Sequence, residues 1–418
     1  MRLLIALMLS ALALAQAPPQ PLTLERALQT AAENRAEGFA AEHFVEAQQG
    51  AVRQASRAPN PTLSFQTENW RAADEFSVSR DVDYFVFVSQ QIETSGKRRL
   101  RTDAAEADTR IARAEREVLR WQIQNQVTVA WWNAFRAQQE TALIQESLGT
   151  AEELVRYQEV RLREGAGPEI DLIKVRVELE KERRRLAESR IAELNAKHRL
   201  LAEMASDMPA DFPLQPGGEP TASEAEISVA SALANRPDLL LARRIAERDE
   251  ALTSVQRAQT SPDITPYFGY KRTGGFSTLI GGVSIPLKIR DRNDGAIAHA
   301  VAQASRHKQL LRAAEMRVRS DVESALAAQR SRRQIAQSLQ TGLVADATQS
   351  PEIALAAYRE GGVELLYVID ALRTLNEARL LQLQAELDYQ LSRAETLIAA
   401  GVSPNRMTQN DEPIGGVK

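Results

Sequence analysis

The chain has 418 residues, of which 26% are charged, only 5% are aromatic and none is cysteine. This composition is typical of long helices and coiled coils rather than of a compact α/β enzyme, and the lack of cysteine excludes disulfides, thiolate metal sites and cysteine nucleophiles. The net charge of −4, with Lys and Arg interleaved among acids, gives no reason to expect a nucleic-acid partner.

Residues 1–15 are expected to be a secretory signal peptide. Met1-Arg2 is a short basic start, and the apolar run from Leu3 to Ala15 has the length of a signal h-region. Small residues at the end of this run predict cleavage before Gln16. A membrane anchor is the alternative, but the run is short for a helix that spans a bilayer.

The remainder of the chain is expected to contain two copies of one structural unit. The first copy, residues 16–207, begins with a helix at LTLERALQTAAENR, and the second, residues 226–400, begins with the similar stretch EISVASALANRPDLLLARR. A linker rich in Pro and Gly, residues 208–225, joins the copies. The polar tail, residues 401–418, is expected to be disordered.

Two strands are predicted after the first helix of each copy. They lie in APNPTLSFQTENW and DVDYFVFVSQQIE in the first copy, and in SPDITPYFGYKR and STLIGGVSIPLKI in the second. These stretches are rich in aromatic and β-branched residues, and several alternate between two kinds of side chain, which is typical of a strand with two different faces. Val88-Ser89 in the first copy matches Val283-Ser284 in the second.

A long helix is predicted after each pair of strands. No Gly or Pro occurs from Lys97 to Leu148 or from Ala296 to Thr341, so each helix is expected to extend for ~60 residues, or roughly 90 Å. Two similar stretches, REGAGPEIDL (residues 163–172) and REGGVELLY (residues 359–367), then interrupt the helices. Because glycine accepts the left-handed conformation of a tight reversal, they are predicted to be the tips of two helical hairpins.

The number of predicted strands bears on whether one chain could form a closed β-barrel. Strands of about ten residues suit a tilted transmembrane β-strand, yet four strands cannot close a barrel, and lipid does not tolerate open sheet edges. Either the sheet belongs to a soluble periplasmic coiled-coil scaffold, or several chains pool their strands. Three chains would give about twelve strands and leave a lumen.

In their order and spacing, these features resemble those of the TolC-type outer-membrane efflux proteins, from Leu22 to Val402. The repeat, the opening helix, the strand pairs and the two tips carry the resemblance, and the REGAGPEIDL tip with the short linker is most similar to the CzcC-like heavy-metal branch. The resemblance implies a mainly α fold with a small β part. Three chains would share a twelve-stranded barrel in the Gram-negative outer membrane, joined to a periplasmic α-barrel.

The function implied by the resemblance is a passive exit duct and not an enzyme. A periplasmic adaptor (membrane fusion protein) and an inner-membrane RND-type pump would deliver heavy-metal cations to it, with drugs or secreted proteins as the alternative cargo. No cofactor, catalytic residue or metal site is expected, because the sequence has no phosphate-binding loop and no nucleophile elbow. Its four histidines also lack a convincing ligand spacing: His43, His198, His299 and His307.

The resemblance also implies roles near the tips. Asp171 and Asp370 match positions where acidic rings line the periplasmic constriction, and Tyr358 matches a tyrosine that ties neighbouring hairpins shut. Val363 stands where a gate arginine is expected, and Tyr367 stands where a second acid is expected, so a salt-bridged gate is in doubt. Asp171 is also explained as an acid in the first turn of a helix, and Tyr358 as coiled-coil packing.

Two further groups of residues have implied roles. The small tip residues match the family's adaptor-docking turns, although turn geometry alone also explains them: Gly165, Ala166, Gly167, Pro168, Gly361 and Gly362. Trp70 and Tyr84, at strand ends, are expected in an aromatic belt at the membrane interface, with packing on the sheet as the alternative.

Overall fold

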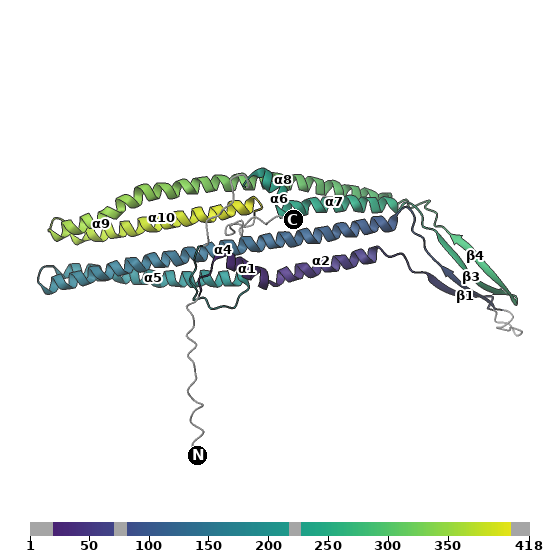
Figure 1. Ribbon diagram of the computed structural model, residues 1–418, viewed down its shortest axis with the longest axis horizontal. Helices are drawn as coiled ribbons and strands as arrows, with labels where there is room; N and C mark the ends of the chain where they lie inside the picture. The colour runs from purple at the N-terminus through teal and green to yellow at the C-terminus, as the bar shows by residue number, and fades with distance from the viewer. Residues whose placement is uncertain (1–19, 71–81, 217–226, 403–418) are drawn as a thin grey trace, which may run out of the picture. The chain divides into compact units, whose positions relative to one another are not determined.

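Figure 1 shows the computed structural model of the chain, in which residues 20–70, 82–216 and 227–402 are described. The predicted signal peptide, residues 217–225 of the predicted linker and the tail beyond residue 402 lie outside these ranges. The described chain forms two compact units, of which one comprises residues 37–70, 82–119 and 233–318 and the other comprises the remainder. Within the described ranges, no helix is both long and apolar enough to cross a membrane.

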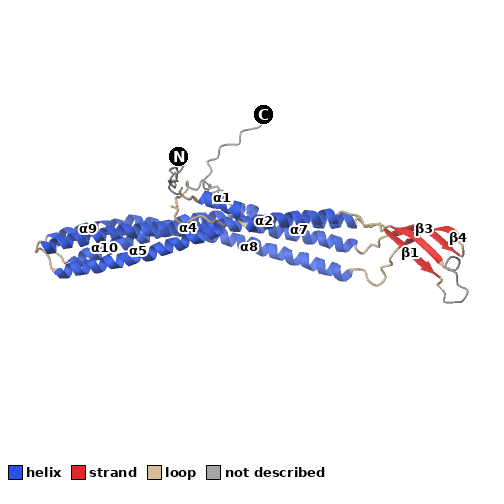
Figure 2. Cartoon of the chain, turned by 90° about the horizontal axis from the view of Figure 1, so that it is seen from below, coloured by secondary structure: helices blue, strands red, loops and turns tan. Residues whose placement is uncertain are grey.

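The first of these units contains the only sheet of the described chain, together with helices that lead into it and out of it. The strands are β1 (Thr62–Glu68), β2 (Asp83–Ser89), β3 (Thr265–Thr273) and β4 (Phe276–Ser284). They form one antiparallel sheet in the order β1-β2-β3-β4, coloured red in Figure 2. Because β2 pairs with β3, the sheet joins the strand pair of the first copy to that of the second.

The sheet has two chemically different faces, as the alternation in the sequence predicts. Paired residues share a face, and one face carries exposed apolar side chains from all four strands: Leu63, Phe65, Val86, Val88, Phe268, Tyr270, Leu279 and Val283. The opposite face carries Ser64, Gln66 and Lys271 among aromatic rings. A Cβ at Gly269 would collide with the backbone of Val86 and Phe87 in β2, and one at Gly282 would collide with the ring of Tyr267.

Two helices precede each strand pair, where the sequence predicted one. They are α1 (Leu24–Asn34) and α2 (Ala36–Ala55) in the first copy, and α6 (Val229–Asn235) and α7 (Pro237–Ala258) in the second. The break falls at the same matched position in both copies, because Arg35 and Arg236 are extended, with ψ angles of 118° and 124°. In the second copy, Pro237 at the first helical position reinforces the break, since proline disfavours helical dihedrals in the preceding residue.

A buried ion pair anchors the junction between helices and strands. Lys97 opens helix α4 (Lys97–Arg163), and its ammonium lies 2.6 Å from Asp263 Oδ1 and 2.8 Å from the carbonyl of Ser261, just before β3. The side chain of Lys97 is only 5% exposed. Burial opposes ionisation of Asp263, but the hydrogen bonds from Lys97, Thr94 and Gln91 prevail and lower its pKa.

The second unit is built from two helical hairpins. One joins the later part of α4 to α5 (Glu169–Met204), and the other joins α9 (Val344–Arg359) to α10 (Leu365–Ala399), as Figure 1 shows. With 67 residues, α4 is ~100 Å long, which confirms the predicted long helix of the first copy. Gly401 and Val402, assigned to the disordered tail from the sequence, instead form the turn that ends α10, and Val402 is buried.

In the second copy the long helix contains one irregular turn, which the sequence analysis did not predict. A π-helical segment, η1 (Leu339–Leu343), separates α8 (Asp294–Ser338) from α9, which itself contains Pro351. Such π turns are rare and occur mostly as single turns inside α-helices.

Aromatic packing fixes the middle of α4. Trp131 is 1% exposed, and its ring lies 5.2 Å from that of Phe135 and 5.0 Å from that of Trp132. The indole nitrogen of Trp131 donates to the carbonyl of Leu22, 3.3 Å away. Trp131 and Trp132 are therefore buried packing residues.

Candidate functional site

The two hairpin tips are built by the same turn. Gly165 donates to the carbonyl of Leu162, and Ala166 donates to that of Arg161, while Gly361 and Gly362 make the equivalent bonds to Tyr358 and Ala357. This pair of bonds is a Schellman motif, which requires a left-handed residue after the helix. Gly165 and Gly361 supply it, with φ angles of +69° and +78°.

The shared turn fixes which tip residues are equivalent. Since Gly165 corresponds to Gly361, Asp171 corresponds to Tyr367, and Asp370 corresponds to Lys174. Asp171 lies in the first turn of α5, whereas Asp370 lies in the second turn of α10. The two predicted acids therefore occupy different levels of their hairpins.

Tyr358 lies where the two hairpins meet. It is 6% exposed, and its hydroxyl lies 3.0 Å from Asp171 Oδ2 and 3.2 Å from the amide nitrogen of Gln158. The guanidinium of Arg161 lies 4.8 Å above the tyrosine ring and also donates to the carbonyl of Ala166 in the tip. Burial raises the pKa of Tyr358; the Gln158 hydrogen bond opposes this shift, and Asp171 adds to it. We call Tyr358, Asp171, Gln158 and Arg161 the tip latch.

Apolar side chains surround the tip latch and hold the hairpins together. One cluster combines buried residues of both hairpins, including Val175 and Leu172 of α5 with Leu365, Val368 and Ile369 of α10. Tyr358 belongs to this cluster. Tyr358 therefore packs between the helices as one reading of the sequence expected, and its role in closing the mouth stays a prediction.

Asp370 and Tyr367 lie elsewhere, on the surface of the second hairpin. They line a groove of about 480 Å³ between α9 and α10, together with Asp346, Ile353 and Val363. Tyr367 is 63% exposed. Asp346 was not singled out from the sequence, and only the fold brings it beside Asp370, because the two lie on different helices.

A charged bridge below the tip latch was also missed. Arg373 of α10 donates through Nε to Glu178 Oε1 of α5 over 2.7 Å, and a second bond links the same two side chains. The hydrogen bond from Arg373 lowers the pKa of Glu178; burial opposes this, and Lys181 adds to the lowering. No sequence signal pairs these residues, which are 195 positions apart.

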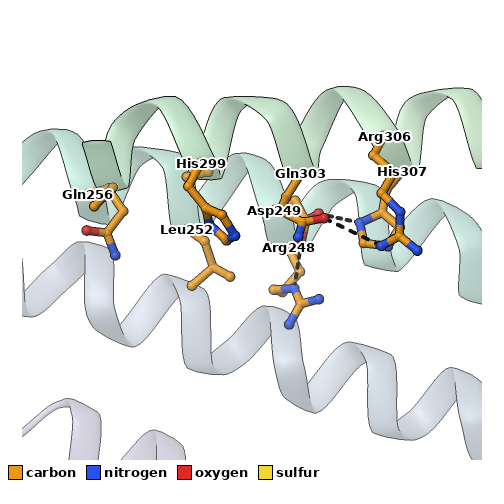
Figure 3. Close-up of a pocket in the computed structure, with 10 residues that line it drawn as sticks. Arg248, Asp249, Leu252, Gln256, His299, Gln303, Arg306 and His307 are labelled. Atoms are coloured by element: carbon orange, nitrogen blue, oxygen red, sulfur yellow. Dashed lines mark hydrogen bonds and ion pairs between the residues drawn. The ribbon is translucent and has the colours of Figure 1, made fainter. Parts of the chain in front are cut away.

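His299 and His307 line one cleft in the unit that contains the sheet. Figure 3 shows both histidines on α8, facing Arg248 and Asp249 of α7 across a cleft of about 590 Å³. His307 Nδ1 lies 2.5 Å from Asp249 Oδ2, and Arg248 approaches the other carboxylate oxygen. The histidines are ~12 Å apart along the helix, too far to share one ion. In the described part of the chain, no three His, Asp or Glu side chains are placed to hold a metal.

The predicted belt residues lie at one end of the sheet. Trp70 is 63% exposed, and its indole donates to Thr67 Oγ1 over 3.0 Å. Tyr84 pairs with Thr67 on one side and with Arg272 on the other. Tyr84 and Thr67 lie on the face that carries the exposed apolar side chains of the sheet.

Comparison with known proteins identifies the fold. The chain is 29% identical to the cobalt-zinc-cadmium resistance protein CzcC of Cupriavidus metallidurans over 363 residues, which cover 86% of this chain and 85% of CzcC. It superposes with a TM-score of 0.76 on a membrane protein from Pseudomonas aeruginosa, at 19% identity, covering 92% of this chain and 91% of that one. The channel protein CusC gives the same TM-score at 18% identity, with 93% and 96% coverage.

The family assignment follows from the sequence itself. The family described as "Outer membrane efflux protein" matches residues 27–205 and 229–401, which together include both hairpins and all four strands. The resemblance seen in the sequence is thus confirmed, and with it the mainly α fold that carries a small sheet. The chain belongs to the outer membrane efflux protein family and acts as an efflux channel in the outer membrane.

Proposed function

We propose that three copies of the chain form the exit duct of a tripartite system that expels heavy-metal cations. The observation that supports this assembly is the open sheet: among the described residues no strand pairs with the outer edge of β1 or β4, and one face is apolar and exposed. A lipid environment requires such edges to be paired. Three sheets joined edge to edge would give about twelve strands around a lumen.

The cargo proposal rests on the likeness to CzcC, whose name states resistance to cobalt, zinc and cadmium. A duct for such ions needs no tight site of its own, since transport is driven by a pump in the inner membrane. Asp370 and Asp346 give the α9–α10 groove a negative lining. In a trimer this groove would present acids around one axis, and rings of acids favour cations.

The tip latch is proposed to keep the periplasmic mouth closed. It joins the α9–α10 hairpin to the α4–α5 hairpin through Tyr358 and Asp171, so separating the hairpins requires breaking a hydrogen bond to a charged group, worth about 1.5–3 kcal/mol. Val363 stands where the gate arginine is expected, and the hydrogen bond between Tyr358 and Asp171 would take over the role of that arginine. A periplasmic adaptor docking on the small tip residues, among them Gly165, Gly361 and Gly362, would supply the energy for opening.

Two measurements test the proposal. Light scattering of the detergent-extracted mature protein, corrected for bound detergent, is expected to give three chains per particle. A monomer that needs no detergent would refute the shared barrel. Cargo is tested by expressing the chain with a heavy-metal pump and adaptor in cells that lack their own outer-membrane component. Restored growth in cobalt, zinc or cadmium supports metal efflux, whereas protection against drugs alone supports the alternative cargo.

A further inference from the structure

A small cavity lies within the junction of the two hairpins, below the tip latch. Its volume is about 30 Å³, and its polar lining comes from three helices: Ser147 and Thr150 of α4, Glu178 and Glu182 of α5, and Arg373 and Asn376 of α10. A cavity of this size holds about one water-sized group. Every helix that meets there contributes to the contact between the hairpins.

The cavity contains an acceptor that has no donor. Glu182 is 9% exposed, and its Oε2 atom is buried without a hydrogen-bond partner. The neighbouring hydroxyls are already committed, because Ser147 donates to the carbonyl of Leu143 and Thr150 donates to that of Glu146. Towards any further partner, their oxygens can therefore act only as acceptors. A buried acceptor left unpaired costs about 1–3 kcal/mol.

Among the described residues, Glu182 is the one carboxylate lining the cavity that no cation contacts by a hydrogen bond. On α5, Glu178 is paired with Arg373 of α10 and also accepts a hydrogen bond from Lys181. Arg185 and Arg373 favour ionisation of Glu182, while Glu178, one helical turn away, opposes it. Helix α4 lines the cavity only with uncharged side chains. A single proton on Glu182 would let its buried oxygen donate a hydrogen bond, and it would remove a charge that burial disfavours.

We propose that this cavity is a proton-binding site, and that the neutral form of Glu182 holds the two hairpins together by donating its proton to an oxygen of the cavity. Loss of the proton leaves a buried carboxylate beside Glu178 and loosens the contact of α5 with α4 and α10. The contact between the two hairpins is therefore more stable at acid pH than at alkaline pH, so that it responds to the pH of the periplasm.

The electrostatics of the site agree with this assignment. Burial raises the pKa of Glu182; Arg185 opposes the shift and Glu178 adds to it. A carboxyl whose pKa is raised by folding stabilises the native state fully below its unfolded pKa, about 4.3 for glutamate, and loses this contribution as the pH rises through the folded pKa. Glu178, whose pKa is lowered, has the opposite dependence.

The test compares Glu182→Gln with Glu180→Gln in the full mature protein, purified in detergent. Glu180 is on the same helix but is exposed, and it pairs with Arg183. Infrared difference spectra across the titration are expected to show the band of a protonated carboxylic acid that persists above the ordinary glutamate range. The band should disappear in Glu182→Gln and remain in Glu180→Gln. If Glu182→Gln does not fold, Glu182→Met, neutral and of similar size, takes its place.

Thermal unfolding provides a second readout. Between acid and neutral pH, the Tm of the wild type is expected to fall relative to that of Glu182→Gln, while Glu180→Gln follows the wild type. In Glu178→Gln the infrared band should disappear at lower pH than in the wild type, because a neighbouring negative charge is removed. Equal titrations of the wild type and Glu182→Gln would refute the proposal. So would a rise in the wild-type Tm with added Na⁺ or Mg²⁺ at constant ionic strength that Glu182→Gln lacks, because a metal ion would then be the occupant.

Discussion

The hydroxyl of Tyr358 donates a hydrogen bond to the Asp171 carboxylate across 3.0 Å, and this bond joins two hairpins whose residues are 187 positions apart in the chain. Both side chains were expected near the periplasmic mouth, but for separate reasons. In the structure they form a single hydrogen bond, in which the tyrosine hydroxyl is the donor and the aspartate carboxylate is the charged acceptor.

Replacing Tyr358 with Phe is expected to weaken the closed mouth while preserving the packing. The ring stays in the apolar cluster, but the hydrogen bond to a charged acceptor is lost, at a cost of about 1.5–3 kcal/mol. This shifts the balance of closed and open states by roughly tenfold or more. Conductance of single channels in planar bilayers measures the change.

Tyr157→Phe is the matched control for that variant. Its ring lies 5.7 Å from the Arg359 guanidinium, and this contact does not involve the phenolic hydroxyl. The control channel should conduct like the wild type. Equal conductance of the wild type and Tyr358→Phe would show that the tip latch does not hold the mouth closed.

A lysine on the apolar face of the sheet is expected to prevent membrane assembly. Phe65, in the middle of β1, is 68% exposed on that face, whereas Ser64 lies on the other face, opposite Phe87. If the apolar face contacts lipid, Phe65→Lys costs about 2–4 kcal/mol near the bilayer midplane, and Ser64→Lys costs much less. The yield of trimer extracted from outer membranes measures both. A greater loss of trimer in Ser64→Lys than in Phe65→Lys would mean that the opposite face of the sheet contacts lipid.

Alanine at the tip glycines is expected to destabilise the protein, although each tip is exposed. Gly165 and Gly361 have positive φ angles, at which an added Cβ costs about 1–2 kcal/mol. Gly149, in the interior of α4, has open space around it, and there alanine should instead stabilise the helix by about 0.5–1 kcal/mol. Thermal unfolding distinguishes the two signs. A stabilising Gly165→Ala would contradict the turn geometry.

Lys97→Met is expected to destabilise the junction of helices and strands by about 3–5 kcal/mol, because it leaves a buried carboxylate without its partner. The pKa of Asp263 is lowered in the native state. The stability that depends on this carboxylate is therefore present above its unfolded pKa and is lost as the pH falls through its folded pKa. Denaturant unfolding at neutral and acid pH should show a difference between wild type and variant that shrinks in acid.

Arg99→Gln is the control for Lys97→Met. Arg99 forms an exposed ion pair with Asp103 on the same helix, and such pairs are worth about 0–1 kcal/mol. A loss in Lys97→Met no larger than in Arg99→Gln would mean that the buried pair does not anchor the junction.

The sequence by itself determined the features that repeat at short range. Aromatic and β-branched residues, several of them in alternation, predicted the four strands. The absence of Gly and Pro predicted a long α4, and the glycines of the two similar stretches predicted both hairpin tips. Each of these signals is local, because a strand face, a helix interior and a tight turn each depend on residues only a few positions apart. The duplicated order of these elements was enough to identify the family.

Only the tertiary structure decided which side chains meet. Tyr358 with Asp171, Arg373 with Glu178, and Lys97 with Asp263 are pairs separated by 166 to 195 residues, and no periodicity connects them. The cavity at Glu182 has the same origin, because a glutamate on an otherwise charged helix is buried only when two other helices pack over it. Local patterns specify the elements, but long-range packing determines where a charge lacks a partner.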